Sequence, residues 1–111
     1  MSLLTKMQSA MKKVVWFINE TGTTCTYTPK ATGTHQEIKA YIRELGNEEL
    51  IGDYRQGDLR IEVDASQFLT APKKYDVITI DGKRYAVKDP TGSPRRVGDI
   101  IYTYKFIVRG G

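Results

Sequence analysis

The sequence predicts a mainly β fold, a small antiparallel β-barrel of about six strands with an N-terminal amphipathic helix. Three observations support this fold class. Apolar residues recur at helical spacing at the start of the chain, they alternate with polar residues from Thr23 onward, and an Asp81-Gly82 pair separates two strand-like runs. The chain has 111 residues, enough for one ordinary domain with a modest core. We therefore expect a single domain over 1–111, with a helix over 1–20 and a barrel over 23–110.

The N-terminal stretch has the spacing of a helix with one apolar face. Ser2 suits the N-cap position and Gly22 suits the end of the helix. Trp16 projects roughly opposite the apolar face at about 100° per residue, so it is either packed under a loop or exposed as a contact for another chain. The residues of the apolar face are Leu3, Leu4, Met7, Met11, Val14, Val15 and Ile18.

From Thr23 onward the period of the apolar residues is two, as in strands with one dry face. The alternation is clear over 38–43, 59–64 and 100–108. With 23–28 and the two arms of the Asp81-Gly82 hairpin, these stretches make about six strands. A chain this short buries such strands best by closing them into a barrel, because closure removes exposed edges.

The Asp81-Gly82 pair fixes the register of one hairpin. Both residues tolerate the positive φ of a type I′ turn, and such a two-residue loop places Ile80 opposite Lys83 and Ile78 opposite Tyr85. The side chains that share the apolar face of this hairpin are Ile78, Ile80, Tyr85 and Val87.

Two connections are longer than a hairpin needs and are expected to be contact loops. The first is 44–57, with three glycines and charges of both signs, and the second is 89–99, where two prolines flank a polar stretch. The alternative is that both are ordinary solvated surface loops. The candidate protein-interaction residues are Glu48, Glu49, Asp53, Tyr54, Arg55, Arg95, Arg96 and Trp16.

The sequence predicts no enzyme, no cofactor and no metal site. The single cysteine, Cys25, cannot form a disulfide within the chain, and its setting is that of a strand residue. The single histidine, His35, has no neighbouring ligand for a metal. The carboxylates between Glu44 and Asp53 match no calcium loop. No stretch has the length of a secretion signal or a membrane span, so we expect a soluble protein made in a reducing cytoplasm.

A nucleic-acid-binding small barrel is the alternative function from another class. The net charge of +4 permits such a partner. Binding of single strands needs aromatic side chains on an exposed strand face beside Lys and Arg. The predicted core takes Tyr85, Tyr102 and Tyr104, which leaves Tyr41, Tyr54 and Tyr75 too scattered in the sequence for a platform.

The order of these segments resembles the tailed-phage head-tail joining proteins, which include the head-closure and tail-attachment proteins of the neck. An amphipathic helix is followed by 38–43, a long polar loop, 57–63 and 75–87, so the resemblance covers nearly the whole chain. Its most recognisable part is the hairpin, with Asp76, an alternating apolar strand, the Gly82 turn and Tyr85-Ala86-Val87. The richly apolar helix departs from the family, which varies in that region.

The resemblance implies a structural protein of the phage or prophage virion. It implies a ring between portal or adaptor proteins above and tail proteins below, which closes the DNA-filled head, lies close to packaged DNA and provides a docking face for the tail. In this reading 44–57 is a loop that orders on assembly and 89–99 is a second contact loop. It also implies no membrane partner, a place in the virion neck, and the host cytoplasm during assembly.

Overall fold

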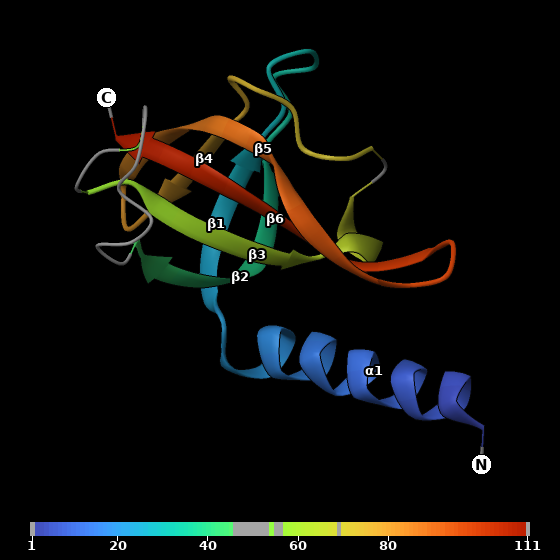
Figure 1. Cartoon of the computed structure of the whole chain (residues 1–111). Helices are drawn as coiled ribbons and strands as arrows, with labels where there is room; N and C mark the ends of the chain where they lie inside the picture. Colours follow the sequence, from blue (N-terminus) through green and yellow to red (C-terminus); the bar gives the residue numbers. More distant parts are fainter. Residues whose placement is uncertain (1, 46–53, 55–56, 69, 111) are drawn as a thin grey trace.

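The computed structural model describes residues 2–45, 54, 57–68 and 70–110, with the backbone alone at 91–93. One helix precedes six strands (Figure 1). The elements in chain order are α1 (Leu3–Thr21), β1 (Thr23–Thr28), β2 (Gln36–Glu44), β3 (Leu59–Asp64), the short 3-10 helix η2 (Ala65–Gln67), β4 (Val77–Ile80), β5 (Lys83–Val97) and β6 (Ile100–Gly110).

The six strands form a closed barrel in the order β1-β2-β3-β6-β5-β4. Every pair is antiparallel, and β1 closes the barrel by pairing with β4 at Thr26 to Thr79 and Tyr27 to Ile78. The predicted mainly β fold, with a small barrel and an N-terminal helix, is confirmed.

The inward-facing residues of the six strands fill the barrel. Phe106 is the largest of the fully buried side chains. The Phe68 ring packs edge-on against Tyr27, with centroids 4.8 Å apart, and closes one end of the core. The buried core residues are Cys25, Tyr27, Ile38, Ala40, Ile61, Val63, Ile78, Val87, Phe106 and Val108.

The hairpin between β4 and β5 has the predicted turn and register. Asp81 and Gly82 have φ of 51° and 78°, as a type I′ turn requires, and Ile78 pairs with Tyr85. At its base two residues oppose one: the Tyr75 amide donates to the Val87 carbonyl at 2.9 Å, and the Val87 amide donates to the Asp76 carbonyl at 2.7 Å. This β-bulge leaves Tyr75 exposed while Asp76 is buried.

The predicted loop over 89–99 is wrong. β5 continues to Val97 and pairs with β6 as far as the Gly98-Asp99 turn, so this stretch is a two-stranded ribbon that extends past the barrel (Figure 1). Pro90 and Pro94 favour a loop locally because proline has no amide to donate. The register shifts four times between Val87 and Arg96, and such bulges admit prolines into a strand pair.

The predicted caps of α1 are confirmed, whereas its apolar face is only partly buried. The Ser2 hydroxyl accepts the Thr5 amide at 3.2 Å, and the Gly22 amide donates to the Ile18 carbonyl at 2.8 Å. Ile18 lies against the barrel, but the N-terminal end of the helix runs past it, and Leu3 is 74% exposed. The helix therefore flanks the barrel with an uncovered apolar end (Figure 1).

Candidate interaction surfaces

Trp16, Phe17 and Tyr41 are exposed aromatic side chains, and we call them together the aromatic surface. Trp16 is 63% exposed, so of the two alternatives for this residue the described structure shows the exposed one. Phe17 of α1 lies 6.3 Å from Tyr41 of β2, centroid to centroid. A groove of about 410 Å³ adjoins these two rings and is bordered by Glu62 and Arg95. Exposed aromatic side chains beside a groove are typical anchors of protein contacts.

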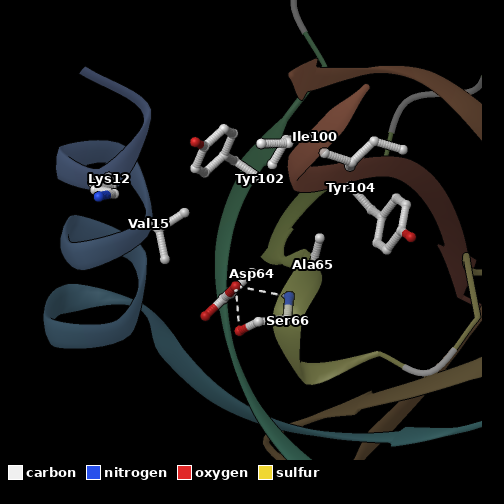
Figure 2. A pocket seen from close by; sticks show the side chains of 9 residues that line it. Lys12, Val15, Asp64, Ala65, Ser66, Ile100, Tyr102 and Tyr104 are labelled. Atoms are coloured by element: carbon white, nitrogen blue, oxygen red, sulfur yellow. Dashed lines mark hydrogen bonds between the residues drawn. The ribbon is translucent and has the colours of Figure 1, made fainter. Parts of the chain in front are cut away.

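A second groove, which we call the ribbon groove, lies between α1 and the start of β6 in the β5–β6 ribbon (Figure 2). Ile100 and Ile101 are 51% and 38% exposed, because β6 begins beyond the barrel and no core covers this part of the strand. Within this groove the Asp64 carboxylate accepts hydrogen bonds from the Ser66 backbone amide at 2.9 Å and from the Asn19 side-chain amide at 2.9 Å. The groove has a volume of about 410 Å³ and is lined by Lys12, Val15, Asp64, Ala65, Ser66, Ile100, Ile101, Tyr102 and Tyr104.

The two candidate arginines have different surroundings, although they are adjacent in β5. Arg95 Nε donates to Glu62 Oε2 at 2.7 Å, and the Thr103 hydroxyl donates to the same oxygen at 2.7 Å. Glu62 is buried on the outer face of the barrel, so Arg95 neutralises a carboxylate within the chain. Arg96 is exposed and pairs with Ile101 in the ribbon. Of the two, Arg96 is the arginine whose side chain is exposed, and its role as a contact residue stays a prediction.

Of the candidate contact residues in the first predicted loop, 44–57, the structure describes Tyr54. It is half-buried, its hydroxyl donates to Asp89 Oδ2, and the Lys88 ammonium lies 6.0 Å from its ring centroid. It therefore packs against β5. The candidates Glu48, Glu49, Asp53 and Arg55 lie outside the described residues.

Sequence reasoning missed a cluster of lysines around Tyr75. The Lys30 and Lys74 ammonium groups lie 5.0 and 5.3 Å from the Tyr75 ring centroid. The consecutive Lys73, Lys74 and Tyr75 were a visible signal, but Lys30 joins them only through the fold. We call Lys30, Lys73, Lys74 and Tyr75 the lysine cluster.

Other chemistry-bearing groups have structural surroundings. Burial raises the pKa of the Cys25 thiol to about 11, which keeps it protonated at neutral pH. His35 Nδ1 lies 2.7 Å from the Thr28 hydroxyl. Within 2–45, 54, 57–68 and 70–110, no three His, Cys, Asp or Glu side chains gather as metal ligands would. Over the same residues no helix combines the length and apolar character that crossing a membrane requires.

The closed barrel and its exposed surfaces define a small β-barrel protein whose apolar contact residues lie on its outer face. The sequence matches the family model of the Phage Head-Tail Attachment protein over residues 4–101, so the chain belongs to this family. The expected relation to phage head-tail joining proteins is thereby confirmed, and the chain is a structural protein of the phage neck. No match was found among curated proteins.

Proposed function

We propose that several copies of this chain form a ring in the phage neck, which closes the DNA-filled head and provides a docking face for the tail. Portal or adaptor proteins lie above the ring and tail proteins below it. The chain acts by binding and catalyses no reaction. The observation that carries this proposal is the family match over residues 4–101, together with two separate apolar surfaces on one small barrel.

Two different surfaces are what a ring requires, because each copy must use one surface toward the preceding copy and another toward the next. The groove beside Phe17 and Tyr41 lies along one side of α1, at Lys13 and Val14. The ribbon groove lies along the other side of the helix, at Lys12 and Val15. One copy therefore offers distinct surfaces for a head-to-tail contact or for two different partners.

The exposed apolar residues form small groups, so a single contact between two copies is expected to be weak. A preformed portal presents many sites at once, and contacts that are weak singly become stable when a template raises their effective concentration. Assembly on the head is then favoured over assembly in solution. This order of events prevents empty rings from capturing tails.

The test is complementation of a phage that lacks this protein with a variant carrying Trp16→Ala and Tyr41→Ala. We expect the yield of tailed, infectious particles to fall at least tenfold, while the melting temperature stays close to that of the unmodified protein because both side chains are exposed. Glu37→Ala, an exposed change on the same strand as Tyr41, is the matched control. Full particle yield from the double variant, or necks without a ring in electron micrographs, would contradict the proposal.

A further inference from the structure

We infer that the lysine cluster binds the phosphate backbone of duplex DNA. The place of this contact in the virion rests on the proposed ring, through which the packaged duplex would pass. The binding itself is a property of the purified chain. The cluster comes from two segments far apart in the sequence, Lys30 after β1 and Lys73 to Tyr75 before β4.

A buried carboxylate holds these two segments together. Asp76 is 5% exposed, and its Oδ1 accepts the Lys30 backbone amide at 2.9 Å while its Oδ2 accepts the Lys73 backbone amide at 2.9 Å. The Tyr27 hydroxyl donates to the same carboxylate. Three donors from three places therefore fix the backbone positions from which the lysine side chains extend.

Tyr75 determines how the ammonium groups are displayed. Its φ is 75°, a strained conformation for a non-glycine residue that is often found at functional sites. The bulge at the base of the hairpin maintains this conformation and leaves the ring 56% exposed. Lys30 and Lys74 both lie within cation–π distance of the ring, which offsets part of their mutual repulsion.

The surroundings of the cluster include one further lysine and one carboxylate. Lys74 shares an adjoining pocket with Lys88, Tyr54 and Asp89. Among the described residues that line this pocket, the one carboxylate is that of Asp89, which accepts a hydrogen bond from the Tyr54 hydroxyl. The Asp76 carboxylate is buried beneath the cluster, whereas the side chains of Lys30, Lys73 and Lys74 are exposed. The outer face therefore presents cations.

Closely spaced ammonium groups suit the phosphates of a nucleic acid backbone. Lysine binds phosphate as a point charge and releases condensed counterions, so this contact needs no particular base sequence. Three phosphate contacts predict a slope of about −2.7 in log K against log salt, which is a loss of about 40-fold in affinity between 50 and 200 mM salt. A duplex that leaves the filled head through the proposed ring would meet such a contact whatever its base sequence.

The test is fluorescence anisotropy of a short random-sequence DNA duplex titrated with the purified chain over a series of salt concentrations. The variant with Lys30→Ala, Lys73→Ala and Lys74→Ala is expected to bind at least tenfold more weakly at low salt, with a salt slope reduced by about 2 to 3. The matched control replaces Lys6, Lys12 and Lys13 of α1 by Ala. Each variant lowers the net charge of +4 by three, and only the cluster variant is expected to lose binding.

Tyr75 is a positioning residue. Its substitutions test whether DNA affinity depends on how the lysine side chains are arranged or only on their number. Tyr75→Phe keeps the ring and is expected to bind DNA as the unmodified chain does, whereas Tyr75→Ala is expected to bind several-fold more weakly at an unchanged number of lysines. Circular dichroism of each variant checks that it is folded. Equal loss of affinity in the cluster variant and the α1 control would overturn the inference, because binding would then follow net charge alone.

A second readout separates this inference from the proposed function. Particle yield of the cluster variant is measured in the same complementation assay as the aromatic surface. Unchanged DNA affinity with lost tail attachment would overturn the DNA contact and assign the cluster to a protein neighbour. Lost DNA affinity in the purified variant supports the inference even if the proposed ring is disproved.

Discussion

At the scale of single residues, buried carboxylates organise the outer parts of this barrel. Asp58, Glu62, Asp64 and Asp76 are each at most 8% exposed, and each accepts hydrogen bonds from another segment of the chain. Asp58 binds Arg109 through both oxygens, at 2.9 and 2.8 Å. Because a buried charge without partners is costly, removal of one member of such a pair destabilises more than the loss of one ordinary hydrogen bond.

Asp76→Ala is expected to destabilise the fold by about 3 kcal/mol, since it leaves the Tyr27 hydroxyl and two backbone amides without their acceptor. Tyr27→Phe removes one donor and leaves the carboxylate bound by both amides, so it should cost only about 1 kcal/mol. Urea unfolding measures both values. Equal costs for the two variants would show that Asp76 does not hold the two segments together.

Cys25 gives a prediction for alkaline pH. Burial, assisted by the Asp81 charge and opposed by Lys39, raises the pKa of its thiol from 9.0 to about 11. The unfolded chain releases this proton first, so the stability from the protonated thiol is complete below about pH 9 and is lost as the pH rises toward 11. Unfolding of the unmodified chain and of Cys25→Ala between pH 8 and 11 should show a smaller alkaline loss in the variant. Parallel curves would rule out a contribution of Cys25.

Arg95 pairs with Glu62, whereas the adjacent Arg96 is exposed, so the same substitution should have different effects at the two positions. Arg95→Glu places two carboxylates together and should cost about 2 kcal/mol, a figure reduced for the partial exposure of Arg95. Arg96→Glu changes an exposed side chain and should alter stability by about 0.5 kcal/mol or less. We expect it to reduce tail attachment instead. Thermal unfolding and particle yield distinguish the two. A destabilised Arg96→Glu would show that this side chain has a structural partner.

At the scale of elements, the junction between α1 and β1 sets how the helix lies against the barrel. A Cβ atom at Gly22 would lie 2.3 Å from the Ile18 carbonyl oxygen and 3.0 Å from that of Ala40. No side chain fits there, although the φ of −69° is ordinary for any residue. The close approach therefore requires glycine at this position and fixes the direction of the helix.

Gly22→Ala is expected to destabilise the chain by about 2 kcal/mol, because backbone atoms of α1 and β2 must move apart. Thr23→Ala, an exposed change at the next residue, is the control and should have little effect. Urea unfolding measures the difference. An unchanged stability of Gly22→Ala would mean that the helix can shift without cost.

At the scale of the whole molecule, two parts of the chain project from the barrel and expose apolar side chains. The end of α1 and the β5–β6 ribbon both extend past the closed core (Figure 1). The residues of the core cluster lie within the barrel strands, and α1 adds one buried residue, Ile18, close to its C-terminal end. Changes to the exposed side chains of these projections, such as Leu3 and Ile100, are therefore expected to have little effect on folding.

The purified chain is expected to be monomeric at micromolar concentration, since each apolar surface comprises only a few side chains. Light scattering measures the mass directly, and addition of portal-containing heads should then recruit many copies. The 12.6 kDa chain makes a ring easy to tell from a monomer. A stable ring at low micromolar concentration without other neck proteins would contradict assembly on a template.

Local signals in the sequence were sufficient for the elements whose structure is decided locally. The Asp81-Gly82 pair requires a type I′ turn, and the turn in turn fixes the register of β4 against β5. The period of two in β3 and β6 identifies residues such as Ile61 and Phe106 that face one core. The resemblance to head-tail joining proteins was also carried by the order of these segments, and the family match bears it out.

Tertiary structure decided what local signals could not. Pro90 and Pro94 indicate a loop, yet pairing with β6 extends β5 through them, because long-range hydrogen bonds outweigh local preference where bulges relieve the conflict. The stripe of α1 predicts burial, but the barrel is too short to cover Leu3 and Leu4. Lys30 and Lys74 meet at Tyr75 because Asp76 binds two segments, a juxtaposition that depends on the closed barrel and has no signature in the sequence.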